Sequence, residues 1–307
     1  MGEHEGKMIV KANKLVRAKM PLTKLEHRVV ALLISQLSKD DEEFSVQKLP
    51  IRDLHKETDS QTSGDLYRRG EEICQSLLDK KLEIKRLKDG KRKYKGINLM
   101  DSCEYLEGDG YIEAKFNESM KPYLLQLKKR FTMYQVGNYV PLSSTYSMRV
   151  YELLKMREGI TILRISVEEF RDILGVEDSY SSFSQLKYHV IGKAQEEIQE
   201  KTDIHFTYDV EREGRSAERI KFFIHQSTED EGDTPKMEDR TEAPDIDVMN
   251  LFLSDLTQDQ IDNLDQETLD ALHEKAVERA QRENPDRSEN VIQAEAYRHM
   301  KALWEKR

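Results

Sequence analysis

The chain contains an internal duplication, and this feature constrains its fold more than any other. Apolar residues from Leu25 to Leu33 have the i, i+4, i+7 and i+8 spacing of an amphipathic helix. The same spacing returns 121 positions later, from Tyr146 to Leu154. The matched pairs are Leu25 and Tyr146, Val29 and Val150, Leu32 and Leu153, Leu33 and Leu154, Arg28 and Arg149, and the polar helix starts Thr23 and Ser144. LLDKKLEIKR (77–86) also matches IQEKTDIHFT (198–207) in register, so we expect two halves with one order of elements.

The second half predicts three helices followed by a two-stranded ribbon. Capping-box spacings and glycines mark the helix ends, and alternating apolar residues mark the strands. The predicted elements are a helix over 144–158 closed by Gly159, a strand over 162–165, a helix from Val167 capped by Ser166 with Glu169 and closed by Gly175, a third helix capped by Ser182 with Gln185, and strands at 204–208 and 220–224. This order is typical of a winged helix, in which the third helix enters the major groove of DNA.

The predicted fold class is therefore α+β, with two tandem winged-helix domains related by pseudo-symmetry and a small helical C-terminal tail. We place the N-terminal domain at 8–137, the C-terminal domain at 138–226, an acidic linker at 227–250 and the tail at 251–307. Thr257 and Gln260 have capping-box spacing, and Pro285 separates two helical stretches of the tail. We expect the second of these to span 290–306.

The net charge of −10 is unevenly distributed. Residues 227–307 carry 22 acidic and 10 basic side chains, whereas residues 1–226 carry a net charge of +2. The acidity belongs to the tail, so the charge of the first 226 residues is compatible with a polyanionic partner.

The predicted third helix has an outward face suited to base edges. Its apolar residues Phe183, Leu186, Val190, Ala194 and Ile198 form one stripe at 100° per residue. Ser184, Gln185, Tyr188 and His189 point away from that stripe, and Lys187 lies at its flank. Gln bonds adenine in a bidentate manner, Ser reads donors or acceptors, and Tyr or His contacts phosphates. The alternative is an ordinary solvated helix face; the fold context favours DNA contact.

Two basic hairpins are candidate phosphate contacts. The second wing carries Arg212, Arg215 and Arg219, but Glu211, Glu213 and Glu218 make a salt-bridged hairpin tip an almost equal alternative. The first half has nine basic residues between Lys80 and Lys95, around a predicted Asp89–Gly90 turn. The candidates there are Lys85, Arg86, Lys88, Lys91, Arg92 and Lys93. A basic ribbon is often only a soluble edge, yet the charge density favours phosphate contact.

The sequence carries no signature of an enzyme. No phosphate-binding loop is present, since IGKAQ (191–195) lacks the glycine-rich lead and the Ser or Thr. His189, His205 and His225 lack the H-x-H spacing of metal-dependent nickases, and no tyrosine is marked as a nucleophile. Cys74 and Cys103 fit no metal spacing and are expected as reduced thiols of a cytoplasmic protein. We expect no cofactor, no metal and no membrane segment.

Several motifs, in the correct order, resemble the plasmid replication initiator (Rep) family that binds iterons. They are KANKLVRAKMPLTKLEHRVVALLISQL in the first half, KPYLLQLKKRFTMYQV and LSSTYSMRVYELL at the centre, and ISVEEFRDILGV, LKYHVIGKAQEEIQEKTDIHFTYDV and GRSAERIKFFI in the second half. The resemblance covers about residues 8–226 and leaves the acidic tail outside. Where the family's recognition segment is frequently basic, this chain reads QLKYHV.

The resemblance implies an initiator that binds repeats at a plasmid origin, opens the origin and loads the helicase. It implies that the second domain reads the repeat, whereas the first contacts the DNA backbone and forms a homodimer that represses its own gene. The implied partners are double-stranded DNA, a second copy, the host initiator and the replicative helicase. Alternation at Ile112, Ala114 and Phe116 predicts another strand in the first half, and extra strands leave a sheet edge available for pairing with a second copy. The alternatives are a winged-helix transcriptional regulator and a winged-helix module that binds only proteins.

Overall fold

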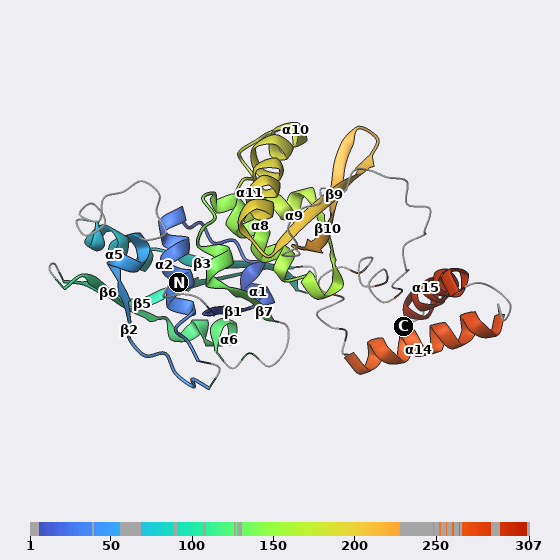
Figure 1. Cartoon of the computed structure of the whole chain (residues 1–307), viewed down its shortest axis with the longest axis horizontal. Helices are drawn as coiled ribbons and strands as arrows, with labels where there is room; N and C mark the ends of the chain where they lie inside the picture. The colour runs from blue at the N-terminus through green and yellow to red at the C-terminus, as the bar shows by residue number, and fades with distance from the viewer. Residues whose placement is uncertain are drawn as a thin grey trace. The chain divides into compact units, whose positions relative to one another are not determined.

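The first half of the chain forms a winged helix with additional strands. The computed structural model (Figure 1) describes residues 6–38, 40–55, 69–88, 91–106, 109–125, 127, 131–227, 248, 252, 256, 260, 264, 266–283 and 289–305. The elements of the first half are β1 (Met8–Ala12), α1 (Asn13–Val16), α2 (Lys24–Ile34), β2 (Gln47–Pro50), α3 (Ile51–His55), α5 (Gly70–Leu78), β3 (Lys81–Lys88), β4 (Lys91–Asn98), β5 (Met100–Tyr105), β6 (Tyr111–Phe116), a 3₁₀ turn (Glu118–Met120), α6 (Lys121–Leu124) and β7 (Phe131–Gln135).

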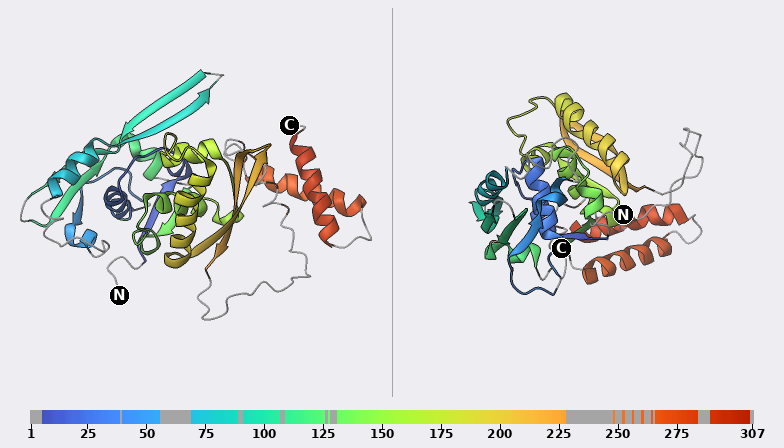
Figure 2. Two further views of the ribbon diagram at one scale, coloured as in Figure 1. Left: turned by 90° about the horizontal axis from the view of Figure 1, so that it is seen from above. Right: turned by 60° about the vertical axis from the view of Figure 1, so that its left-hand side comes forward.

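The strands described in this half form three small antiparallel sheets. β2, β6 and β5 pair in that order, β1 pairs with β7, and β3 pairs with β4 as a separate ribbon. The predicted alternating strand is β6, and its residues Ile112, Ala114 and Phe116 are all buried. The β3–β4 ribbon extends away from the packed elements of this half, as the left view of Figure 2 shows. The predicted Asp89–Gly90 turn lies outside the described residues.

The second half follows the predicted order of a winged helix. Its elements are α7 (Val136–Tyr139), α8 (Thr145–Lys155), a 3₁₀ turn (Glu158–Ile160), β8 (Ile162–Ser166), α9 (Val167–Leu174), α10 (Phe183–Leu186), a π-helical turn (Lys187–Gly192), α11 (Lys193–Lys201), β9 (Ile204–Glu213) and β10 (Ser216–Gln226). The strands pair in the order β8, β10, β9. Ser166 and Ser182 accept the capping hydrogen bonds of α9 and α10, and Gly175 ends α9 with a positive φ of 67°. The expected boundary at 137/138 falls inside α7.

The duplication predicted from the sequence is visible in the helices. α2 and α8 each have 11 residues, and their N-caps are Thr23 and Ser144, which are matched positions in the two halves. Ile73 and Leu77 of α5 are buried, as are the matched residues Ala194 and Ile198 of α11. Each half then continues into its own ribbon, β3–β4 or β9–β10, so the two winged helices are confirmed.

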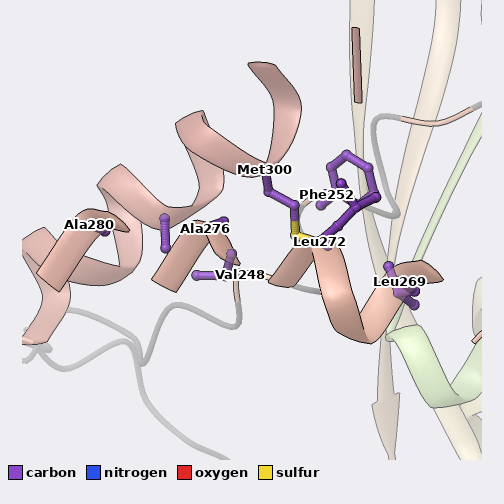
Figure 3. Packing of buried hydrophobic residues seen from close by; sticks show 8 residues of the cluster. Val248, Phe252, Leu269, Leu272, Ala276, Ala280 and Met300 are labelled. Atoms are coloured by element: carbon purple, nitrogen blue, oxygen red, sulfur yellow. The ribbon is translucent and has the colours of Figure 1, made fainter. Parts of the chain in front are cut away.

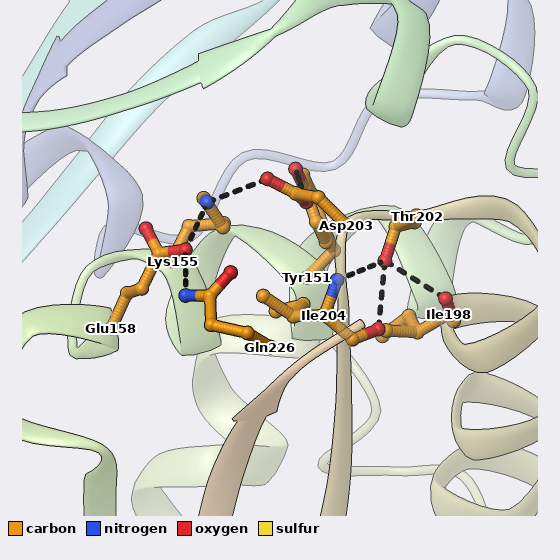
Figure 4. Close-up of polar contacts among 8 residues, drawn as sticks. All are labelled: Tyr151, Lys155, Glu158, Ile198, Thr202, Asp203, Ile204 and Gln226. Atoms are coloured by element: carbon orange, nitrogen blue, oxygen red, sulfur yellow. Dashed lines mark hydrogen bonds and ion pairs between the residues drawn. The ribbon is translucent and has the colours of Figure 1, made fainter. Parts of the chain in front are cut away.

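A polar cluster ties the base of the second wing to α8 (Figure 4). Asp203, in the turn between α11 and β9, accepts hydrogen bonds from Tyr151 Oη at 2.8 Å and Lys155 Nζ at 2.9 Å. Glu158 accepts a hydrogen bond from Gln226 at the end of β10, at 2.7 Å. Thr202 Oγ1 donates to the carbonyl of Ile198 at 2.8 Å, which closes α11. These contacts fix where the third helix ends and where the wing begins.

The junction between the two halves is a buried ionic cluster. Lys11 of β1 contacts Glu152 of α8 at 2.5 Å, and Arg149 contacts the second oxygen of Glu152 at 2.5 Å. Tyr134 of β7 donates to Glu152 at 2.5 Å as well. Burial alone would raise the pKa of the Glu152 carboxyl, but the neighbouring cations lower it to about 2. Glu152 is therefore ionised in the core and neutralised by two cations.

A separate compact unit contains the C-terminal helices α14 (Gln266–Glu283) and α15 (Glu289–Glu305). They bury a small apolar cluster, shown in Figure 3, made of Val248, Phe252, Leu269, Leu272, Ala276, Ala280, Ala296 and Met300. His299 contacts Glu283 at 3.0 Å. The predicted helical tail is confirmed, with its two helices on either side of Pro285, whereas the Thr257 cap lies outside the described residues.

Candidate nucleic-acid interface

The exposed side of the third helix gathers most of the residues predicted to read DNA. Ser184, Gln185 and Lys187 are exposed, and Tyr188 is the most exposed of the large hydrophobic side chains described, at 74%. Leu186, Val190, Ala194 and Ile198 are buried against the domain core, as the apolar stripe predicts. His189 is only half-buried, and Phe183 lies at the edge of the core rather than within it.

The third helix is not a uniform α-helix, which differs from the expectation of 100° per residue. A π-helical turn, Lys187–Gly192, separates α10 from α11. Because a π turn holds one extra residue, Ile191 is buried as well as Val190. Gly192 lies close to the carbonyl of Lys187, and a Cβ there would be 3.3 Å from that oxygen. The pattern of apolar and polar residues in this segment fits an α-helix as well as a π-helical turn, so the sequence does not predict the turn.

A row of four aromatic side chains in contact, Tyr146, Tyr180, His189 and Tyr188, packs beside the exposed turn. Tyr180, in the loop before the third helix, stacks on His189 with ring centroids 5.3 Å apart and an interplanar angle of 18°. Tyr188 meets His189 edge to face at 5.0 Å, and Tyr146 of α8 meets Tyr180 at 6.1 Å. Tyr180 has a positive φ of 53°, an unfavourable conformation for a residue with a bulky side chain. Tyr188 and His189 were predicted from the sequence, whereas Tyr180 lies in no motif and was not.

Gln185 has a structural role that competes with base contact. Its backbone N–H donates to Ser182 Oγ at 3.2 Å, and its side-chain oxygen accepts from the Ser182 N–H at 3.5 Å. Ser181 Oγ also donates to that oxygen at 3.4 Å. A bidentate contact to adenine requires the same oxygen, so Gln185 would have to release its weak capping bonds before it could read a base.

The second wing places its arginines differently. The Arg212 guanidinium lies 6.0 Å from the ring centroid of Phe183, so it leans toward the start of the third helix. Arg215 is exposed in the hairpin turn after Gly214, which has a positive φ of 59°. Arg219 contacts Glu218 at 3.1 Å, and exposed pairs of this kind are weak. The salt-bridged alternative therefore describes Arg219, whereas Arg212 lies between the wing and the helix.

In the ribbon of the first half, basic residues of one strand are paired with basic residues of the other. β3 and β4 pair antiparallel, with Arg86 opposite Lys93, Leu87 opposite Arg92, and Lys88 opposite Lys91. Lys85 pairs with Tyr94, whose side chain is 60% exposed. Like charges directly opposite each other destabilise a two-stranded ribbon.

Two family models match the chain in consecutive order. The model "Initiator Replication protein, WH1" matches residues 8–155, and "Initiator Rep protein, WH2" matches residues 166–224. The chain belongs to the replication initiator (Rep) family with two winged-helix domains. The resemblance inferred from the motifs is thus confirmed, and the acidic tail lies outside both matches.

Two proteins of Escherichia coli are similar to part of this chain. A "PI protein" of Escherichia coli is 31% identical over 156 residues, which cover 45% of this chain and 51% of that protein. A "Replication initiation protein" of Escherichia coli is 26% identical over 136 residues, which cover 42% of each chain. The matched parts therefore span about half the length of these relatives or less.

A solved structure shares the fold. The crystal structure of the Pi initiator protein in complex with iteron DNA matches with a TM-score of 0.61 and 23% sequence identity. The match covers 74% of this chain and 100% of that chain. Across the part of our chain that the structure describes, no helix is long and apolar enough to cross a membrane, and no three His, Cys, Asp or Glu side chains gather as a metal site.

Proposed function

We propose that this initiator binds directly repeated DNA sequences, or iterons, at a plasmid origin through the third helix of its second winged helix. The observation that carries the proposal is the outward face of the π-helical turn, where Tyr188 is 74% exposed beside Lys187. A DNA groove offers phosphates and base edges to an exposed tyrosine and lysine in this position. The crystallised Pi initiator protein, a structural neighbour, was solved in complex with iteron DNA.

The remaining contacts divide between reading and anchoring. Ser184, Lys187, Tyr188 and His189 would face the major groove, and Gln185 would join them only by leaving its cap. Arg212 and Arg215 would contact phosphates beside the same groove, because phosphate contacts fix register without carrying sequence. Arg219 would contribute less, since Glu218 already pairs with it.

The first half would anchor the protein through its basic ribbon and supply self-association. Lys85, Arg86, Lys88, Lys91, Arg92 and Lys93 would bind phosphates along a neighbouring stretch of duplex. β5 and β2 are the outer strands of the β2–β6–β5 sheet, and an outer strand has unpaired backbone groups that a second copy could use. We propose that a dimer of this kind represses the protein's own gene, whereas the monomer binds iterons, opens the origin and loads the host helicase together with the host initiator.

Binding to repeated DNA is the decisive test. Duplexes carrying direct repeats of about 20 base pairs, roughly two helical turns, are taken from beside the gene and compared with shuffled duplexes of equal length. We expect ladders of discrete complexes in gel shift on the repeats, one for each repeat occupied. Equal affinity for repeats and shuffled DNA would contradict the proposal.

Two other functions give different outcomes in the same experiment. A winged-helix transcriptional regulator would bind one promoter site without a ladder, and a protein-binding winged helix would not shift any duplex. The second domain carries 12 basic and 15 acidic residues over 138–226. It therefore has no broad positive field to attract DNA, and we expect it to bind through specific contacts.

A further inference from the structure

The two cysteines of the chain lie side by side although 29 positions separate them. The sequence of 307 residues contains only Cys74 and Cys103. Cys74 lies on α5 and Cys103 on β5, and the Cys103 thiol donates to the Cys74 sulfur at 2.8 Å. The two sulfurs need to approach only slightly to reach the disulfide bond length of about 2.0 Å.

The backbone packing of α5 on β5 holds the sulfurs together. Gly70, at the start of α5, lies against the ring of Tyr105, and a Cβ there would be 2.6 Å from the ring atoms. Cys74 is one helical turn after Gly70, and Cys103 is two strand residues before Tyr105. Residues i and i+4 share a helix face, and residues i and i+2 share a strand face. The contact between Gly70 and Tyr105 and the contact between Cys74 and Cys103 therefore belong to one interface between α5 and β5. Only a glycine at position 70 allows the helix and the strand to lie this close.

The surroundings suit a reactive pair rather than an inert core thiol. Cys103 is half-buried, so a small oxidant can reach the sulfur pair, and Cys74 is 5% exposed. The hydrogen bond from Cys103 lowers the pKa of the Cys74 thiol, because it stabilises the thiolate, whereas the same bond and burial raise the pKa of the Cys103 thiol. The Cys74 thiolate is therefore the nucleophile of the pair, and Cys103 is the thiol that can close the disulfide.

We propose that Cys74 and Cys103 form a reversible intramolecular disulfide when a hydroperoxide oxidises the protein. The peroxide transfers one oxygen to the Cys74 sulfur, which becomes a sulfenic acid as the O–O bond breaks and water leaves. The Cys103 sulfur then attacks the Cys74 sulfur, the S–O bond breaks, and the oxygen leaves as a second water with the Cys103 proton. Two thiols and one hydrogen peroxide thus give one disulfide and two waters. A dithiol reductant reverses the reaction by thiol–disulfide exchange.

The position of the pair gives the bond a local consequence. The chain leaves α5, forms the whole β3–β4 ribbon and returns to β5, so the 74–103 bond closes a loop that contains the ribbon. In the reduced protein the root of this loop is held by the hydrogen bond from the Leu99 N–H to the Lys80 carbonyl, at 2.9 Å. The disulfide would fix that root covalently.

The full-length protein itself tests the proposal. We treat it with hydrogen peroxide under native conditions, block remaining thiols with iodoacetamide and measure the intact mass. The expected result is a mass lower by about 2 Da, for the two hydrogens lost, with no alkylation and with a linked peptide pair after digestion. Dithiothreitol should restore two alkylatable thiols. Two free thiols after treatment, dimers linked between chains, or oxygen added to the cysteines in place of the bond would each overturn the proposal.

Matched variants distinguish geometry from general reactivity. Cys103→Ser should leave Cys74 able to form a sulfenic acid, detectable with a dimedone-type probe, but no internal bond. Gly70→Ala should slow disulfide formation, because its methyl group pushes α5 away from Tyr105 and β5. Hydrogen exchange at the amides of β5 should be slower in the oxidised wild-type protein than in the reduced protein. An unchanged disulfide rate in Gly70→Ala, or unchanged exchange in β5, would contradict the role of the helix–strand contact.

Discussion

Arg28 and Arg149 make the same contact in opposite directions. Arg28 of α2 donates to the carbonyls of Val140 at 2.9 Å and Leu142 at 3.3 Å, in the segment that leads into α8. Arg149 of α8 donates to the carbonyls of Val16 at 2.7 Å and Ala18 at 2.8 Å, in the segment that leads into α2. Both arginines are 3% exposed. The two arginines occupy matched positions of the duplication. Each one binds the backbone of the segment that leads into the other arginine's helix.

We predict that lysine cannot replace either arginine. A guanidinium offers several donors in a rigid plane, and two carbonyls are bonded at each site, whereas an ammonium is a single point charge on a flexible stem. Arg28→Lys and Arg149→Lys should each lower the free energy of unfolding by about 1–3 kcal/mol, because a buried carbonyl loses its donor. Urea unfolding measures this. Arg52→Lys, at a side chain that is 67% exposed, serves as the control. Equal midpoints for all three variants would show that the reciprocal contact adds no stability.

The buried carboxylate at the junction should be harder to replace than its lysine partner. Glu152→Gln leaves Lys11 and Arg149 facing each other in the core without an anion, which costs about 3–5 kcal/mol for a broken buried pair. Lys11→Met leaves Glu152 paired with Arg149 and hydrogen-bonded by Tyr134, so a smaller loss is expected. Urea unfolding of both variants ranks them. A Lys11→Met protein less stable than Glu152→Gln would contradict this account of the cluster.

His27 gives the fold a dependence on pH just below neutrality. Burial, with Arg149 and Lys11 nearby, lowers its pKa from 6.5 to about 3, and Tyr139 Oη lies 3.0 Å from its Nδ1. Between these two values the unfolded chain binds a proton that the folded chain refuses, so stability is full above pH 6.5 and falls as the pH falls. At pH 5 the loss from this residue is about 2 kcal/mol relative to pH 7.

The substitution His27→Gln isolates this effect. The amide keeps an acceptor for Tyr139 but does not titrate, so the loss of stability between pH 7 and pH 5 should shrink by about 2 kcal/mol. The acidic range of Glu152 lies between its ordinary pKa of 4.5 and about 2, below the two pH values compared. His273→Gln on α14 is the control. A wild-type protein equally stable at both pH values would rule out a neutral buried His27.

The duplicated pattern predicted the paired helices, their caps and the order of elements, because apolar spacing and capping are local properties of the sequence. The pattern does not predict the reciprocal role of Arg28 and Arg149, since that role depends on which loop each helix meets. It does not predict the π-helical turn either, because the apolar stripe fits an α-helix almost as well. The approach of Cys74 to Cys103 depends on Gly70 packing against Tyr105, a tertiary contact that spacing alone does not specify.

The third helix should depend more on Tyr188 than on Gln185. Gln185 already accepts capping bonds from Ser182, whereas Tyr188 projects from the π-helical turn. We predict that Tyr188→Ala weakens binding to the cognate repeat by about 1–3 kcal/mol and binding to shuffled DNA much less. Gln185→Glu, which keeps the capping oxygen, tests base contact by Gln185 separately from loss of the cap. Fluorescence anisotropy on both duplexes measures this. Equal losses on the two duplexes would show that the helix does not read sequence.

The basic ribbon should contribute affinity without specificity. Replacing Lys91, Arg92 and Lys93 by glutamine removes three positive charges that the register places opposite Lys88, Leu87 and Arg86. For each phosphate that the variant no longer binds, the slope of log K against log salt should fall by roughly 0.9, on repeats and shuffled DNA alike. Because like charges at directly paired positions destabilise a ribbon, the same variant should be at least as stable as wild type in urea.

A second triple variant shows whether the change in slope comes from phosphate binding by the ribbon or from the lower net charge of the protein. Lys275, Arg279 and Arg282 lie on α14, so their replacement by glutamine removes equal charge from the tail helix and should leave the slope unchanged. An unchanged slope in the ribbon variant would mean that the ribbon is a soluble edge. A fall in both variants would assign the effect to net charge. Only a fall confined to the ribbon variant, with its stability retained, identifies β3 and β4 as a phosphate-binding surface.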